Sequence, residues 1–303
     1  MSRFFRIGLV VIVVLAPAYW LLLRHSPSPG ASYVLDIARV RALADSVPGA
    51  KALEVRYEKI CDLKFYEGML MAGDPWTPTS MPIYSFQLVF PDSTLLIDTA
   101  MARAIAKPDA LLLSFDDAAW QRLLVAMEHA EQIVITHEHM DHIGGIAAHP
   151  RLAQIRDRVR LTEEQLGNPE GMDPAQLPAD AMAGYEPLRY DVMHAIAPGV
   201  VLIEAPGHTP GSQMVYVKRA DGRELLFLGD VSWRERNIEQ VRERPLLMTL
   251  VIGENREQVL GQFQALNALR ASEPALAQVP GHDGPAMERF TAAGLLQPGF
   301  AAP

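Results

Sequence analysis

The chain has 303 residues, of which 49% are hydrophobic and 21% charged, and its formal net charge is −9. This length can bury a substantial core, as one large domain or as two smaller ones. The acidic balance and the lack of a Lys/Arg cluster argue against a nucleic-acid partner, and the single cysteine, Cys61, excludes an intrachain disulfide and a Cys-rich zinc site.

The N-terminal segment is the first predicted element. Residues 7–23 (IGLVVIVVLAPAYWLLL) carry no charge, with Arg3 and Arg6 before them and Arg24 after them. The pattern predicts an uncleaved hydrophobic anchor helix over residues 1–24, then a linker over 25–32 and a globular domain over 33–303. Because more positive charge precedes the apolar run than follows it, we expect a membrane-anchored domain outside the cytoplasm, on the periplasmic side. A cleaved export signal, giving a secreted or periplasmic protein, is the alternative.

Short strands and helices follow along the globular part. Hydrophobic periodicity and turn residues separate them: strands alternate, and helices repeat their apolar positions every three to four residues. The predicted strands are 53–60, 85–90, 94–98, 131–136, 200–205, 213–218, 224–230 and 277–279, and the predicted helices are 33–47, 116 or 117 to 130, and 254–271. This mixture indicates an α/β (α+β) domain, but the pattern alone does not choose its architecture.

The stretch VITHEHMDHIGGI, residues 134–146, carries the strongest chemical signal. His137, His139, Asp141 and His142 follow a predicted buried strand and precede two glycines. A loop that leaves a strand end can direct such side chains into one cleft, as chelation requires. Imidazole and carboxylate ligands favour zinc, iron or manganese over calcium, so the stretch predicts a metal site.

Three more donors lie at the ends of other predicted strands. His208 is in EAPGHTPGS, Asp230 ends LLFLGD, and His282 is in VPGHDGP. Each is close to a glycine, where the backbone can turn sharply and bring a side chain near another group. Each signal is weak alone. Together with the first cluster they supply seven donors, enough for two metal ions that share one carboxylate.

This order of motifs resembles the metallo-β-lactamase fold superfamily, over roughly residues 50 to 290. The resemblance implies a four-layer αββα sandwich with the site along one edge of the sheets. It implies that one metal is held by three histidines, that the other is held by one aspartate and two histidines, and that an aspartate bridges both. In this chain the first set is His137, His139 and His208, the second is Asp141, His142 and His282, the bridge is Asp230, and Asp98 would brace the site from behind.

Departures from other branches narrow the function that the resemblance implies. The bridging Asp230 disfavours a true β-lactamase, His139 disfavours a flavodiiron protein, and residues 231–303 leave little room for the helical domain of glyoxalase II-like enzymes. The remaining similarity is to lactonase-like enzymes, including those that open N-acyl homoserine lactones. These often carry a tyrosine three residues after the bridging aspartate, where this chain has Trp233.

The resemblance therefore implies a hydrolase with two divalent metal ions, most simply zinc, which opens a lactone or another ester-like bond in a small molecule. A metal-bridging hydroxide would attack the carbonyl, and Asp141 is the candidate to orient it and to pass a proton to the leaving oxygen. Two alternatives stay open: a mononuclear iron persulfide dioxygenase, and a non-catalytic envelope binding protein.

Substrate contacts are less clearly marked in the sequence. The Pro- and Met-rich segment 166–196, which contains Met182 and Tyr185, either overhangs the site or forms an ordinary surface excursion. Trp76 and Trp233 are further candidates for the substrate pocket. Glu138 lies between two expected ligands, and we expect it to point away from the metals.

Overall fold

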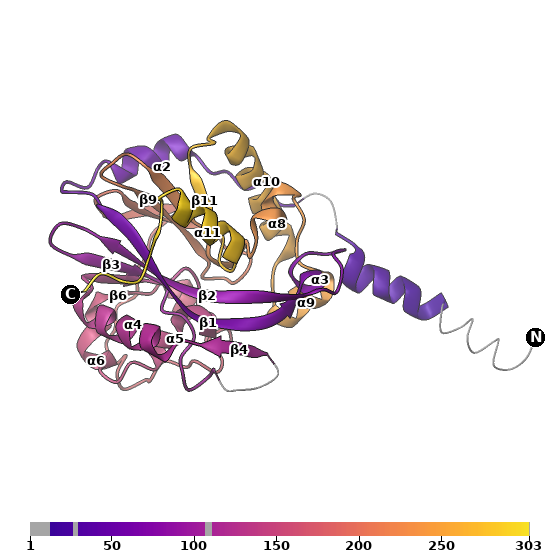
Figure 1. The fold of residues 1–303 in the computed structure, drawn as a ribbon, viewed down its shortest axis with the longest axis horizontal. Helices are drawn as coiled ribbons and strands as arrows, with labels where there is room; N and C mark the ends of the chain where they lie inside the picture. Colours follow the sequence, from indigo (N-terminus) through magenta and orange to yellow (C-terminus); the bar gives the residue numbers. More distant parts are fainter. Residues whose placement is uncertain (1–12, 27–29, 107–110, 303) are drawn as a thin grey trace, which may run out of the picture.

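Two β-sheets stack face to face and carry helices on their outer faces (Figure 1). This computed structural model describes residues 13–26, 30–106 and 111–302. The first sheet has the strand order β12-β1-β2-β3-β5-β6, with β4 paired to β1, and the second has the order β11-β10-β9-β8-β7. The strands of the first sheet are β1 Glu54–Tyr66, β2 Pro78–Val89, β3 Thr94–Ile97, β4 Leu112–Phe115, β5 Gln132–Val134, β6 Val159–Arg160 and β12 Gln297–Pro298. Those of the second are β7 Met193–Ala197, β8 Val200–Glu204, β9 Gln213–Lys218, β10 Glu224–Phe227 and β11 Ala277–Val279.

The helices divide between the two outer faces and the ends of the sheets. Their bounds are η1 Trp20–Arg24, α2 Ile37–Ala44, α3 Glu67–Leu70, α4 Asp117–His129, α5 Met140–Ala147, α6 Leu152–Ile155, η2 Arg156–Arg158, α7 Glu163–Leu166, η3 Gly229–Val231, α8 Glu235–Glu239, α9 Leu246–Ile252, α10 Arg256–Ser272 and α11 Gly284–Ala292. Figure 1 shows α4, α5 and α6 against one sheet and α2 and α10 against the other.

Alternation along the strands separates three apolar layers. In β3, Leu96 faces α4 and α5, whereas Leu95 and Ile97 face the second sheet. In the same way Tyr216 of β9 faces α10, whereas its neighbour Val215 lies between the sheets. Successive side chains of a strand point to opposite faces, so each strand serves two layers.

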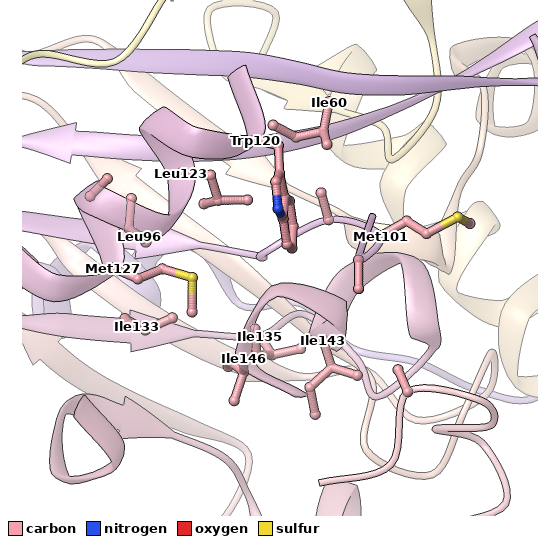
Figure 2. Packing of buried hydrophobic residues seen from close by; sticks show 14 of the residues in the cluster. Ile60, Leu96, Met101, Trp120, Leu123, Met127, Ile133, Ile135, Ile143 and Ile146 are labelled. Carbon is pink, nitrogen blue, oxygen red and sulfur yellow. The ribbon is translucent and has the colours of Figure 1, made fainter. Parts of the chain in front are cut away.

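The layer outside the first sheet is built by α4, α5 and α6. Trp120, Leu123 and Met127 of α4 pack in one cluster with strand residues such as Ile133 and with the two isoleucines of α5 (Figure 2). Asp116 caps α4, because its side chain accepts a hydrogen bond from the backbone N–H of Ala119. The four layers are thus helix, sheet, sheet and helix, a mixed α/β arrangement.

Most predicted elements are present with adjusted ends. The hairpin of 85–90 and 94–98 is the β2–β3 pair, and the predicted helix 254–271 is α10, which begins after its cap residue Asn255. The predicted helix 33–47 shortens to α2, and β1 continues beyond residue 60 to Tyr66. Residues 140–147, expected as a loop, form α5.

The predicted membrane anchor is corrected by the structure. Its residues 1–12 lie outside the described part of the chain, and residues 13–19 are helical and continue into η1. Among residues 13–26, 30–106 and 111–302, no helix has both the length and the apolar content needed to cross a membrane. The predictions of a membrane partner, and of a domain held outside the cytoplasm by that anchor, are therefore wrong on this finding.

Candidate metal centre

Parallel strands deliver the predicted donors to one edge of the two sheets. In the first sheet β3 and β5 are parallel, and Asp98 and His137 come one and three residues after them. In the second sheet β10 and β11 are parallel, and Asp230 and His282 each come three residues after their strand. The carboxyl ends of parallel strands meet at the same edge, so residues distant in the sequence converge there. His208 follows β8, which runs in the same direction as β10.

Three histidines and one carboxylate form the first donor group. Nδ1 of His139 lies 3.1 Å from Nε2 of His137 and 3.0 Å from Nε2 of His208. Oδ2 of Asp230 lies 3.4 Å from Nε2 of His208 and 3.7 Å from Nε2 of His137. These four atoms surround one point at the spacing from which a metal ion can be held.

The second donor group contains Asp141, His142 and His282. Oδ2 of Asp141 lies 3.7 Å from Nε2 of His142 and 3.6 Å from Nε2 of His282. The other oxygen of Asp230, Oδ1, lies 2.9 Å from Nε2 of His282 and 3.3 Å from Nε2 of His142. Asp230 therefore presents one oxygen to each group, as a bridging ligand would.

Unsatisfied polar atoms test whether these residues fit a metal. Nε2 of His142, Nε2 of His282 and Oδ1 of Asp230 are all buried and have no hydrogen-bond partner. Buried polar atoms in folded proteins are normally paired, because leaving them unpaired costs about 1 to 3 kcal/mol each. All three atoms face the same point of the second group, and a divalent metal there would satisfy them together.

The histidines are oriented by groups behind them. Nδ1 of His142 lies 2.8 Å from Oδ2 of Asp98, whose carboxylate also accepts hydrogen bonds from the backbone N–H and the hydroxyl of Thr136. Nδ1 of His282 lies 2.9 Å from the backbone oxygen of Pro82. Such contacts fix the ring and leave Nε2 free to bind a metal. Asp98 reaches this position with a φ of 60°, a strained backbone conformation.

Two glycines are required by close approach of the backbone. A Cβ at Gly145, at the end of the histidine-rich stretch, would lie 2.5 Å from the backbone oxygen of Thr99. A Cβ at Gly281, next to His282, would lie 2.5 Å from Oδ1 of Asp230. Both distances are well inside van der Waals contact, so the absence of a side chain lets α5 and the His282 loop close around the donors.

Burial and mutual charge set the protonation of the donors. Burial lowers the pKa of His137 well below its usual value and lowers the pKa of His139 to about 3. Burial alone would raise the pKa of Asp230, but His282 and His142 outweigh it and hold that pKa well below the usual range. His137 and His139 are therefore neutral and Asp230 is ionised, the forms that bind a metal, whereas the carboxylates of Asp230 and Asp98 raise the pKa of His142 well above its usual value despite its burial.

A cavity of about 660 Å³ opens onto both donor groups. One wall is apolar and comes from β1, β2 and α9, whereas the segment after α7 adds polar groups. The apolar wall contains Leu63, Phe65, Met81, Leu111, Met140, Trp233, Met248, Leu250, Val251 and Ile252. The polar lining contains Asn168, Glu170, Asp173, Thr209 and the donors His139, Asp141, His208 and Asp230. Among the described residues that line this cavity there is no lysine and no arginine.

The four residues predicted for a substrate pocket are placed differently. Trp233 lines the cavity, but its indole N–H donates to Oδ2 of Asp230 at 2.6 Å and is therefore engaged. Met182 and Tyr185 pack instead against the α4–α5 cluster, and the Tyr185 hydroxyl bonds the backbone of Val159 and Leu161. Trp76 is 43% exposed beside Tyr66 and is not part of the lining. Of the four, the structure places Trp233 alone among the described residues that line this cavity.

Glu138 is buried and points away from both donor groups. Its carboxylate accepts hydrogen bonds from the Thr209 hydroxyl at 2.8 Å, from the Asn168 side chain at 2.6 Å and from the Gly211 N–H at 3.4 Å. It thereby ties the histidine-rich stretch to the loop that carries His208 and to the polar wall of the cavity. Burial raises its pKa.

Two residues near the site carry no signal in the sequence. Glu254 lies 2.9 Å from Nδ1 of His208, and Arg244 is ion-paired with it. Neither is part of a motif, and Glu254 reads in the sequence as the start of a helix. Only the folded chain shows that both lie behind metal donors.

Comparison with known proteins identifies a matching family and a similar enzyme. A family model described as the metallo-beta-lactamase superfamily matches residues 81–282. The N-acyl homoserine lactonase AiiA of Bacillus thuringiensis subsp. kurstaki is 24% identical over 175 residues, which cover 53% of this chain and 68% of that protein.

Solved structures agree in fold. The quorum-quenching N-acyl homoserine lactone hydrolase gives a TM-score of 0.62 at 17% identity, over 81% of this chain and 97% of that one. AidC, a dizinc quorum-quenching lactonase in complex with a product, gives 0.55 at 15% identity, over 80% and 92%. At these identities the likeness shows the fold alone. The family match, which spans most of the described site, shows that the chain belongs to the metallo-beta-lactamase superfamily and is one of its metallo-hydrolases.

Proposed function

We propose that this chain is a dinuclear lactonase that opens neutral lactones bearing an apolar acyl arm. The supporting observation is the pairing of two donor groups, which share Asp230, with a largely apolar cavity whose described lining has no cationic side chain. The proposal places residues 33–303 in one hydrolase domain. Imidazole and carboxylate donors in this number suit zinc at both positions.

The cavity also disfavours anionic substrates. The described lining offers no lysine or arginine to pair with a carboxylate or phosphate that a substrate carries away from the metal centre, and Glu170 and Asp173 would repel such a group. A lactone with an acyl chain is neutral, and its chain can lie against α9 and the β1–β2 hairpin. The lactonase relatives named above act on molecules of this kind, which supports the same choice.

Divalent ions bound by the two groups would polarise the substrate carbonyl and lower the pKa of a water molecule. The chain itself holds the donors in place through Asp98, Pro82 and Glu254 and excludes bulk water with the apolar wall. Asp141 lines the cavity beside the second group, where its free oxygen can accept a proton and pass it to the leaving alkoxide. This assigns proton transfer to Asp141.

Metal analysis of the full chain, combined with a substrate panel, tests the proposal. We expect close to two zinc ions per chain and hydrolysis of N-hexanoyl homoserine lactone, with little activity on a β-lactam carboxylate or a phosphodiester. Asp141→Asn should lower kcat more than it raises KM. One iron per chain, oxygen consumption on a persulfide and no hydrolysis would instead support the mononuclear dioxygenase.

A further inference from the structure

A buried ion pair lies directly behind the first donor group. Nε of Arg244 donates to Oε2 of Glu254 at 2.9 Å, and a second guanidinium nitrogen contacts the same oxygen. Both side chains have no exposed surface, and Arg244 is the largest fully buried side chain of the described residues. Burying two charges costs more free energy than a surface pair would, and such a pair is weak evidence of stabilisation. The pair is therefore better explained by how it positions neighbouring residues than by a gain in stability.

Glu254 fixes one of the metal donors. Its Oε2 lies 2.9 Å from Nδ1 of His208, so Nδ1–H donates to the carboxylate and Nε2 is left as the acceptor. That Nε2 is the atom directed at His139 and at Oδ2 of Asp230. The neighbouring Asn255 adds a backbone hydrogen bond to the oxygen of Gly207 at 2.8 Å, which holds the loop of His208 from the same side.

Arg244 reaches the other donor from two directions. It donates to the backbone oxygen of Asp230 at 3.0 Å, and its guanidinium lies 4.4 Å from the ring centroid of Trp233. The indole N–H of Trp233 in turn donates to Oδ2 of Asp230 at 2.6 Å. Arg244 thus holds the backbone of Asp230 directly. It holds the carboxylate of Asp230 indirectly, through its cation–π contact with Trp233.

The pair also closes the ends of α9 onto each other. Arg244 comes two residues before α9, which runs from Leu246 to Ile252, and Glu254 comes two residues after the helix. The ion pair therefore connects the two ends of the segment that contains α9. Four residues of this helix, Met248, Leu250, Val251 and Ile252, line the cavity. The contacts that hold His208 and Asp230 therefore also hold the apolar wall.

We propose that Arg244 and Glu254, together with Trp233, are positioning residues that keep His208 and Asp230 in register for the first metal and fix α9 beside it. This inference rests on the proposed two-metal centre. It predicts that loss of the pair weakens metal binding at the first group much more than at the second group, whose histidines Asp98 and Pro82 support.

The test is a double variant, Arg244→Met with Glu254→Leu, in the full chain. Replacing both charges by apolar side chains of similar volume is often neutral for stability, so the fold should be kept. The matched control is Arg256→Met with Glu243→Leu, which removes a neighbouring, partly buried ion pair, one with no hydrogen bond or ion pair to a donor among the described residues. Zinc dissociation constants are measured by chelator competition, and Co²⁺ spectra report ligand geometry.

We expect the first double variant to weaken one of two zinc dissociation constants by about 10- to 100-fold and to change the Co²⁺ spectrum, while the control keeps both constants within about threefold. Unchanged constants and a superimposable spectrum in the first double variant would overturn the inference, as would equal weakening in the control. A wild-type chain that binds no metal would overturn the proposed function as well, so the two failures differ.

Two single variants decide the matter if the double variant does not fold. Trp233→Phe keeps a ring beneath Arg244 and removes the indole N–H, and Glu254→Asp withdraws the carboxylate from His208 by about one methylene. Each should weaken the same dissociation constant, with the melting temperature of the metal-depleted protein unchanged. Wild-type constants in both variants would refute the positioning role.

Discussion

Asp230 is the residue on which the two donor groups converge, because each of its oxygens faces one of them. Asp230→Asn replaces one of these anionic oxygens by an amide nitrogen, which cannot bind a cation. We expect the variant to lose most of both metals and at least about 100-fold in kcat/KM. Metal content by mass spectrometry and a lactone assay provide the check. Glu170→Gln, a change in the cavity wall outside both groups, should keep two metals; retention of two metals by Asp230→Asn would refute the bridging role.

Asp98 contacts His142 of the second group directly, whereas it reaches His137 of the first group by way of the Thr136 hydroxyl. Asp98→Asn keeps the shape of the side chain, and asparagine tolerates the positive φ at this position. The amide cannot supply the same charge to His142 Nδ1, so zinc affinity at the second group should fall by about 10- to 100-fold. Chelator competition should show one weakened constant and one intact constant. The opposite result, in which the first group weakens, would contradict the assignment of Asp98.

Among single residues, the sequence predicts the metal donors wherever a donor follows a strand and lies beside a glycine. All seven donors that it singled out come together in the structure, because the parallel strands end at one edge. Glu254 and Arg244 were not identified, since a glutamate before a helix and a lone arginine have many ordinary roles. Glu254 contacts His208, and Arg244 contacts Asp230, only in the folded chain, where the His208 loop packs against residues 230–254.

The helix α9 supplies a testable wall of the cavity. Val251 lines the cavity and is 71% exposed, so Val251→Asp should leave the fold intact while placing a charge where an acyl chain would lie. Each methylene that loses apolar contact gives up about 0.8 kcal/mol, so kcat/KM should fall at least about tenfold for an N-decanoyl lactone. The value for an N-butanoyl lactone should change by less than about twofold.

Leu247→Asp provides the control on the same helix. Leu247 is 42% exposed but does not line the cavity, so the new charge should leave the dependence on chain length unaltered. Equal effects of the two variants on both lactones would remove α9 from the substrate site.

The helix α4 is held by its buried face. Leu123 is completely buried between α4 and the first sheet, and Leu123→Ala should lower the free energy of unfolding by about 2 to 5 kcal/mol because a cavity remains (Figure 2). Val125→Ala, at a 44% exposed position two residues away, should change it by less than about 0.5 kcal/mol. Urea unfolding followed by circular dichroism measures both. Similar values would contradict this packing of the helix.

Elements with a clear period and a recognisable end could be predicted, as α4 shows with its Asp116 cap and its apolar face. Others could not. α5 carries ligands and two glycines, which read as a loop, yet contact with residues 99–102 makes it helical. β4 exposes much of Leu112–Phe115 and, among the strands that the structure describes, pairs with β1, so neither alternation nor burial marks it.

The arrangement of the whole molecule depends on pairings between distant strands. Periodicity indicated a mixed α/β chain, but the order β11-β10-β9-β8-β7 follows from contacts that no local pattern contains. Only the resemblance of the motifs implied two sheets, and the superfamily assignment is confirmed by the match over residues 81–282. The apolar run at the N-terminus predicts a helix that crosses a membrane, but the described residues contain no helix long and apolar enough to do so.

The donors join the two halves of the molecule, so metal ions bound to them would also stabilise the fold. His137, His139 and His142 follow a strand of the first sheet, whereas His208, Asp230 and His282 follow strands of the second. A ligand that binds only the folded chain stabilises it by RT ln(1 + [L]/Kd), about 4 kcal/mol at a free concentration of 1,000 Kd. Zinc should therefore raise the melting temperature of the metal-depleted protein by at least about 5 °C, and a chelator should reverse the shift. Calorimetry of the wild type and of Asp230→Asn measures this. A much smaller shift in Asp230→Asn is expected, because Asp230 presents one carboxylate oxygen to each group; an equal shift in both proteins would mean that zinc stabilises the chain elsewhere.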